Sequence, residues 1–337
     1  MYVFNVRNVS DALPIVLHKL SEVGVERDSQ NGYVTKFSGP VTTKYNRPQE
    51  RVMFHPERDC NPFFHLFESL WMLAGRNDVA WLEQFNSNIS NYSDDKVTFH
   101  GAYGHRWIKH FHFDQLKKII EALSINTDDH RCVLQMWDAK VDLCKQGKDF
   151  PCSLMAVFSV NDNSQLDMTV YNRSNDIVWG AYGANAVHFS MLQEYVAAAL
   201  GLPMGKYWQV SNNLHAYKDT LEKVKGLESM GEELSGLSVS KNPYDTVKPY
   251  PMVSTSIKSW NFDLEVFMAK GPVCGLNDPF FKQVVTPLWW AWKAFKQKDD
   301  PRRFTNALNN AKNCRAEDWK LACCEWLQRR EEKANAK

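Results

Sequence analysis

The segment from residue 152 to residue 200 constrains the fold more than any other part of this chain. Two runs rich in strand-forming residues, 154–160 and 165–171, flank a four-residue loop of turn formers at 161–164. This spacing predicts an antiparallel β-hairpin. Cys152 lies at the entry of the first strand and Arg173 at the exit of the second. The hairpin therefore places both residues at the same end of a sheet.

Two other segments have the spacing of apolar residues that is typical of helices. Residues 185–200 keep a helical period and stop at Gly201, which is a common helix end. Residues 61–75 begin with Asn61, a good N-cap, and finish at Gly75. Because these elements follow one another without repeated β-α-β units, the chain is predicted to be an α/β (α+β) protein with helices packed on a mixed sheet.

The chain is predicted to form one main domain with a helical appendage. Its 337 residues contain no repeat, no low-complexity tract and no Gly/Ser linker. The segment most similar to a domain boundary is 225–251, where Gly, Ser, Lys and Pro accumulate. From residue 277 the sequence has a helical pattern and many charges. We expect a main domain at 1–270 and a helical extension at 271–337 packed on it.

Composition argues against several classes of protein. With 40 basic and 39 acidic side chains the formal net charge is +1, so no global field attracts nucleic acid. No apolar run reaches the roughly 18 residues that cross a bilayer, and the first ten residues lack a secretory pattern. The eight cysteines form no CxxC pair. We expect a cytoplasmic protein without a metal site, a membrane partner or direct contact with nucleic acid.

Cys152 is the candidate nucleophile. It follows Pro151, and the predicted hairpin brings the guanidinium of Arg173 near it, which favours the reactive thiolate. Taken alone, a Pro-Cys pair is weak evidence and fits a buried, inert thiol better. The following residues change that balance, because Arg173 and Ser174 together suit a phosphate and Asp176 adds an acceptor.

Glu68 is the second unusual residue. It lies among Phe64, Phe67 and Trp71 in the helix predicted at 61–75. A carboxylate in such surroundings loses hydration, so it must find a partner or hold a proton. Glu68 is therefore either a structural hydrogen-bond acceptor or an acid or base with a shifted pKa.

Several separated motifs, in order, resemble the thymidylate synthase superfamily, whose members attach a one-carbon unit to C5 of a pyrimidine nucleotide. The similarity covers roughly residues 27–218. The matching motifs are Glu68…Trp71…Gly75, Tyr103-Gly104…Trp107, Arg131, Pro151-Cys152, Arg173-Ser174-Asn175-Asp176, Gly180…Asn185 and His215-Ala216-Tyr217.

The resemblance implies a thymidylate-synthase-like catalytic domain at 1–270 and a reaction with 5,10-methylenetetrahydrofolate. Cys152 would add to C6 of the base, and the Asn185 amide would read uracil, because a cytosine-selective relative has an aspartate there. Compared with the family pattern, the chain has one extra residue between Asp176 and Asn185, which we place between Trp179 and Ala184. Proton transfer is assigned to Glu68, Tyr103 and Asp176, and folate binding to Asp176 and Trp71.

The resemblance also implies which residues bind the rest of the nucleotide. His215 and Tyr217 would bind the sugar 3′-hydroxyl, with both side chains on the same side of an extended segment. Arg173 and Ser174 would bind the phosphate, with a loosely matched Arg27 from an early loop. Arg131 would reach the phosphate site of the other subunit in a homodimer.

Three departures from the family pattern bear on the outcome of the reaction. Ser153 follows the nucleophile where the family has histidine. A tryptophan of the family is replaced within 88–91 by a small polar side chain, and 320–337 is charged and helical where the family has a closing peptide. A smaller and more polar side chain in the cavity wall gives water access to the intermediate formed after carbon transfer, a 5-methylene pyrimidine still bonded to the cysteine. The chain is therefore predicted to be a deoxyuridylate (dUMP) hydroxymethylase of the kind found in bacteriophages that make 5-hydroxymethyluracil DNA.

Other functions stay open at this point. Another aromatic residue could replace the missing tryptophan, which would leave a thymidylate synthase. A dCMP or CMP hydroxymethylase and a non-catalytic nucleotide-binding relative are further alternatives, and the sequence does not decide between ribose and deoxyribose.

Overall fold

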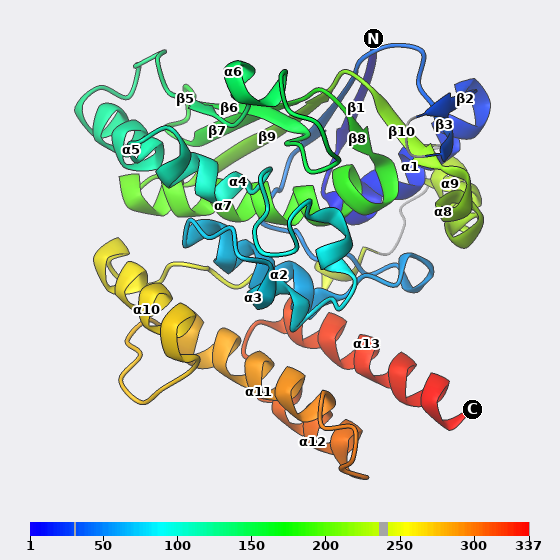
Figure 1. Cartoon of the computed structure of the whole chain (residues 1–337), viewed down its shortest axis with the longest axis vertical. Helices are drawn as coiled ribbons and strands as arrows, with labels where there is room; N and C mark the ends of the chain where they lie inside the picture. Colours follow the sequence, from blue (N-terminus) through cyan, green and yellow to red (C-terminus); the bar gives the residue numbers. More distant parts are fainter. Residues whose placement is uncertain (30–31, 236–241, 337) are drawn as a thin grey trace.

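A six-stranded mixed sheet forms the top layer of the molecule in the computed structural model, which describes residues 1–29, 32–235 and 242–336 (Figure 1). Its strand order is β1-β4-β9-β7-β6-β5. The β1/β4 and β7/β9 pairs are parallel, and the β4/β9, β6/β7 and β5/β6 pairs are antiparallel. The strands are β1 (Tyr2–Val6), β4 (Val41–Tyr45), β5 (Val133–Gln135), β6 (Ser153–Val160), β7 (Leu166–Asn172) and β9 (Met204–Ser211).

A smaller sheet with the order β2-β3-β10-β8 lies beside one edge of the first. It consists of β2 (Val25–Ser29), β3 (Gly32–Lys36), β10 (Leu214–Tyr217) and the short β8 (Asn175–Asp176). The parallel pairing of β10 with β8 aligns His215 with Asp176. Two motifs that are 39 residues apart in the sequence thus lie side by side.

The predicted hairpin is confirmed. β6 and β7 pair antiparallel, with Ser153 opposite Asn172. The loop between them includes Ser164 with a positive φ of 56°. At the other end of the hairpin, the Arg173 amide donates to the Cys152 carbonyl at 2.9 Å.

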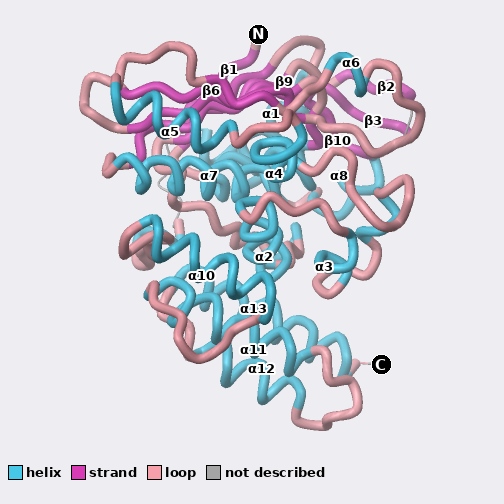
Figure 2. The backbone as a smooth tube through the Cα atoms, turned by 60° about the vertical axis from the view of Figure 1, so that its left-hand side comes forward, coloured by secondary structure: helices cyan, strands magenta, loops and turns pink. Residues whose placement is uncertain are grey.

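Most helices lie on one side of the main sheet and continue below it as further layers, whereas the short α6 lies above the sheet (Figure 2). The segment 61–75 forms α2 (Pro62–Leu73), where the Asn61 side chain caps the N-terminus and Gly75 follows the end with a φ of +64°. The other helices are α1 (Val9–Val23), α3 (Val79–Glu83), α4 (Tyr103–His105), α5 (Gln115–Ile125), α6 (Ala139–Asp142), α7 (Asn185–Leu200), α8 (Lys218–Val224), α9 (Leu227–Ser235), α10 (Ile257–Lys270), α11 (Thr286–Phe295), α12 (Arg303–Lys312) and α13 (Glu317–Asn335). None of the helices in the described ranges is long and apolar enough to cross a membrane.

An irregular π-helical segment, η4 (Ile177–Ala184), leads into α7. The backbone amide of Asn185 bonds to the Gly180 carbonyl, five residues back, and Tyr182 and Gly183 leave helical geometry. A π-bulge accommodates one residue more than a regular helix. It occurs where the sequence predicts one extra residue. α7 then ends as expected at Gly201, which has a φ of +68°.

The C-terminal helices α11 and α13 pack on the side of α2 that carries its phenylalanines. The Phe63 ring lies 5.4 Å from Trp292 and 5.8 Å from Trp326, and Phe67 lies 5.6 Å from Trp289. These three tryptophans are buried. The extension thus supports the helix that contains Glu68, while the division of the chain at residue 270 stays a prediction.

We expect Trp289→Ala to lower the free energy of unfolding by about 3–5 kcal/mol, because it leaves a cavity in a packed aromatic cluster. The indole is 7% exposed and lies within 6.0 Å of the rings of Phe67, Trp81 and Phe267. Denaturant titration measures the change. Trp290→Ala is the matched control, because Trp290 is 49% exposed and should cost under about 1 kcal/mol. Equal losses for the two variants would contradict this packing.

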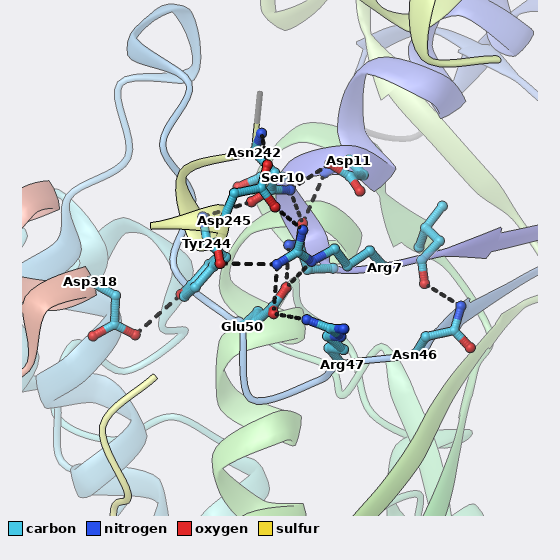
Figure 3. Close-up of polar contacts among 12 residues, drawn as sticks. Arg7, Ser10, Asp11, Asn46, Arg47, Glu50, Asn242, Tyr244, Asp245 and Asp318 are labelled. Atoms are coloured by element: carbon cyan, nitrogen blue, oxygen red, sulfur yellow. Dashed lines mark hydrogen bonds and ion pairs between the residues drawn. The ribbon is translucent and has the colours of Figure 1, made fainter. Parts of the chain in front are cut away.

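The described part of the segment 225–251 is integrated into the fold. Helix α9 packs so closely on α1 that a Cβ at Gly231 would lie 2.1 Å from the Pro14 carbonyl oxygen. Figure 3 shows a polar network beyond it, in which Arg7 pairs with Glu50 at 2.8 Å and also contacts Asp245. Residues 236–241 lie outside the described ranges.

The same network reaches the C-terminal helix (Figure 3). The Tyr244 hydroxyl donates to Asp318 at 3.2 Å, and its ring is buried. Burial raises the pKa of Asp318 to about 6. Residues 242–245 therefore join the N-terminal strand to α13.

Candidate active site

A cavity of about 1020 Å³ opens where the second sheet, η4 and the start of β6 meet. Pockets for drug-sized ligands measure about 300–1,000 Å³, so this one has room for a nucleotide and a second ligand. Eight of the site residues predicted from the sequence line this cavity: Tyr103, Cys152, Arg173, Ser174, Asp176, Asn185, His215 and Tyr217.

The strand entry holds Cys152 beside Arg173. The Arg173 Nη2 atom lies 3.9 Å from the Cys152 Sγ atom, and Nε donates to the Pro151 carbonyl at 2.9 Å. The Tyr103 hydroxyl accepts hydrogen bonds from the amides of Cys152 and Ser153, both at 3.1 Å. The backbone around the sulfur is thus fixed from both sides.

Burial governs the protonation of this thiol. It raises the pKa of Cys152 above the usual range of a cysteine, although the Arg173 guanidinium acts in the opposite direction. Arg173 acts in the direction that the sequence predicts, but desolvation outweighs its charge, so the net pKa of the thiol is raised in the free protein. Burial also raises the pKa of Tyr103 to about 12, so its hydroxyl stays protonated at neutral pH.

We expect the alkylation of Cys152 by iodoacetamide to accelerate with pH to beyond pH 9, because only the thiolate reacts and the pKa is raised. Arg173→Gln should slow the reaction further at pH 8, since it removes the charge that lowers this pKa. The measurement is peptide mass mapping of residue 152. Exposed Cys144 and Cys274 are replaced by serine in every variant. A rate that levels off below pH 8 would contradict the raised pKa.

The second sheet and η4 place the other polar groups around the same cavity. The rings of His215 and Tyr217 are 5.3 Å apart and both line the cavity, as alternation along β10 predicts. Ser174 accepts a hydrogen bond from Asn213 at 3.3 Å. Burial raises the pKa of Asp176, which accepts the Trp179 amide at the start of η4.

Glu68 does not line the cavity but lies behind α7. Its Oε2 atom is 3.1 Å from Nε2 of His188, one helical turn beyond Asn185. The contact is close but lacks hydrogen-bond geometry, and neither atom has another hydrogen-bond partner among the described residues. His65, 6.3 Å from His188 between ring centres, has a pKa well below the usual range because it is buried. His188 is not among the site residues predicted from the sequence, although its spacing from Asn185 puts both on one face of the helix.

Besides Glu68, three more of the expected site residues lie outside the cavity. Trp71 is 3% exposed, donates to Asp78 at 3.3 Å and does not line the cavity, so its expected contact with folate has no support in the geometry. Arg131 is exposed and pairs with Asp129 at 2.7 Å, outside this cavity. Arg27 is exposed on β2, two residues before Ser29 in the cavity wall.

Neither Ser153 nor residues 88–91, which depart from the family pattern, line the cavity. Ser153 is buried, and its hydroxyl donates to Asn172 at 2.8 Å within the sheet. Much of the wall is formed by residues that were not predicted to belong to the site and that add aromatic surface and a positive charge: Trp137, Lys148, Phe150 and Trp179.

A mixed sheet that holds a cysteine beside an arginine in the wall of a large cavity provides the side chains that an enzyme with a thiol nucleophile needs. The sequence profile described as thymidylate synthase matches residues 15–268. The chain belongs to the thymidylate synthase family.

Individual relatives divide between two activities. The chain is 53% identical over 332 residues to the deoxyuridylate hydroxymethyltransferase of Pseudomonas phage M6. The aligned region covers 98% of this chain and 95% of the relative. It is 34% identical over 238 residues to the deoxyuridylate hydroxymethyltransferase of Bacillus phage SP01, covering 66% of this chain and 62% of the relative. It is 27% identical over 218 residues to a thymidylate synthase of Corynebacterium aurimucosum, covering 62% of this chain and 79% of the relative.

Proposed function

We propose that this chain is a deoxyuridylate hydroxymethyltransferase, which transfers a one-carbon unit from 5,10-methylenetetrahydrofolate to C5 of dUMP and gives 5-hydroxymethyl-dUMP. The observation that carries the proposal is the nearly full-length similarity to the phage M6 enzyme. The presence of the Cys152 thiol, the Arg173 guanidinium and the Asn185 amide in one cavity supports it.

The cavity residues suit each part of dUMP. The forked guanidinium of Arg173 and the hydroxyl of Ser174 match a phosphate. His215 and Tyr217 offer hydrogen bonds to the sugar hydroxyl from one side of β10. The Asn185 side-chain amide can donate to O4 of uracil and accept from N3–H.

The chemistry begins when the Cys152 sulfur bonds to C6 of uracil and its thiol proton leaves. The electron pair of the 5,6 double bond moves toward O4, where an amide donor stabilises it, and C5 becomes nucleophilic. Methylenetetrahydrofolate supplies the carbon at the oxidation level of formaldehyde. After C5 loses its proton and tetrahydrofolate departs, water adds to the new exocyclic carbon. The carbon–sulfur bond then breaks and returns the thiol.

The wall of the cavity fits a folate as the second ligand. Trp137, Phe150 and Trp179 offer flat surfaces for a pterin ring, and Lys148 offers a charge to its acidic tail. Family members use methylenetetrahydrofolate as co-substrate. The same aromatic surfaces also favour the second candidate, thymidylate synthase, because they could exclude water from the intermediate.

Product analysis in heavy-oxygen water separates these reactions. Incubation with dUMP and methylenetetrahydrofolate should give 5-hydroxymethyl-dUMP that carries solvent oxygen, and no rise in near-ultraviolet absorbance from dihydrofolate. Stoichiometric dihydrofolate with unlabelled dTMP would identify a thymidylate synthase. Turnover of dCMP alone would identify a cytosine-specific relative, and binding without turnover a non-catalytic one.

We also infer that the protein acts as a homodimer in which Arg131 completes the phosphate site of the partner. Exposed apolar side chains on the strands of the main sheet, Val3, Val133 and Tyr171, support an interface there. Mixing the inactive variants Cys152→Ala and Arg131→Ala should restore activity, because a mixed dimer contains one site with both residues. Light scattering gives the mass, and a monomer that turns over dUMP would contradict the inference.

A further inference from the structure

The Asn185 side-chain amide by itself cannot distinguish uracil from cytosine. Its oxygen accepts and its nitrogen donates, and a half-turn of the amide exchanges the two. One orientation matches O4 and N3–H of uracil, and the other matches the 4-amino group and N3 of cytosine. If Asn185 reads the base, as the proposed function requires, another part of the protein must fix its orientation.

A chain of buried amides runs from Asn185 to the backbone of η4. Asn185 Nδ2 donates to Asn175 Oδ1 at 3.1 Å, and Asn175 Nδ2 donates to Gln209 Oε1 at 3.1 Å. Gln209 Nε2 donates to the Ala181 carbonyl, also at 3.1 Å. Asn175 and Gln209 are 3% and 2% exposed, respectively. We call this series the amide relay.

The Ala181 carbonyl determines the direction of every bond in the amide relay. A backbone carbonyl only accepts, so Gln209 must present its nitrogen to it and its oxygen to Asn175. Asn175 must then present its nitrogen to Gln209 and its oxygen to Asn185. A half-turn of the Asn185 amide would bring two oxygens together, and turning the next amide would only move that contact along the relay.

The π-bulge leaves the Ala181 carbonyl free to accept the last hydrogen bond of the amide relay. In a regular helix the backbone amide of Asn185 would bond to Ala181, four residues back. Here it bonds to Gly180, and the Ala181 carbonyl instead accepts Gln209 and, at 3.3 Å, the Tyr45 hydroxyl. The extra residue in η4 thereby provides the fixed acceptor on which the amide relay ends.

We propose that Gln209 and Asn175 are positioning residues that determine the preference for uracil over cytosine by holding the Asn185 amide in one orientation. Neither residue needs to touch the reacting atoms. The selectivity comes from the cost of opposing two buried acceptors.

The test compares kcat/KM for dUMP and dCMP in Gln209→Met and Asn175→Ala. We expect the ratio of the two values to fall about tenfold or more in both variants, since an unsatisfied buried polar group costs about that factor. Both substrates are assayed on one preparation, so the ratio does not depend on the folded fraction. The matched control is Ser211→Ala. Ser211 also bonds to Asn175, at 3.3 Å, but a hydroxyl can donate or accept, so its loss should leave the ratio unchanged.

Equilibrium binding of dUMP and dCMP, measured in a Cys152→Ala background, provides a second readout that needs no turnover. The affinity ratio should fall there in the same two variants, whichever product the wild type makes. Unchanged ratios in both relay variants would overturn the proposal while leaving the proposed function intact. If the wild-type protein bound neither nucleotide, the proposed function and this inference would fail together.

Discussion

Replacing Cys152 by alanine should lower the turnover of dUMP by at least about 10⁴-fold, because the variant has no nucleophile for C6 and the later steps depend on that bond. The Arg173, Asn185 and His215 side chains are unchanged, so nucleotide affinity should stay within about threefold. The measurements are single-turnover kinetics and equilibrium binding of dUMP.

Cys144→Ser is the control for this variant, since Cys144 is an exposed thiol outside the cavity and should turn over at the wild-type rate. Normal turnover by Cys152→Ala would show that the nucleophile is misassigned. Loss of both turnover and binding would indicate that residue 152 instead supports the structure of the site.

The parts of the site that the sequence predicts correctly are governed by local signals. The hairpin follows from the turn formers at 161–164, and the end of α7 follows from a glycine that adopts a positive φ. These signals act over a few residues. They were sufficient to place Cys152 within reach of Arg173, although the register differs in detail: Val160 pairs with Leu166, and a bulge between Ser153 and Met155 brings Ser153 opposite Asn172.

The protonation of Cys152 could not be predicted in the same way. The charge of Arg173 is apparent from the sequence, but the burial that outweighs it depends on how the whole fold encloses the sulfur. The expected contact of Trp71 with folate stays a prediction for a related reason. A motif fixes its position on α2 but not the residues that surround its indole, which here include Phe99 and Asp78.

The amide relay was also beyond local reasoning. Asn175 and Gln209 are 34 residues apart, and they meet only because β9 and β8 converge on η4. The extra residue near Trp179 was evident as a spacing anomaly, yet its role depends on which carbonyl it frees. Only the three-dimensional structure connects that insertion to the residue expected to read the base.

Asn185→Asp should reverse the preference for the base, lowering kcat/KM for dUMP by about 10²–10³-fold. A carboxylate cannot donate to O4 and repels it, and each such loss costs about 1–3 kcal/mol. For dCMP one contact is kept, since the carboxylate accepts from the 4-amino group, while N3 of cytosine has no proton to donate to it. Assays with each nucleotide measure the change. Asn213→Asp is the control: Asn213 also lines the cavity but bonds to Ser174, so it should weaken both substrates alike.

The amide relay limits how much cytosine activity this single change can gain. The carboxylate that Asn185→Asp introduces would face the Asn175 oxygen, and Asn175 cannot turn its nitrogen toward it while Gln209 is held by the Ala181 carbonyl. Adding Gln209→Met frees Asn175 to turn, so the double variant should use dCMP about tenfold better than Asn185→Asp alone. Unchanged selectivity in Asn185→Asp would mean that another residue reads the base. Equal dCMP activity in the single and double variants would mean that residue 185 reads the base without the relay.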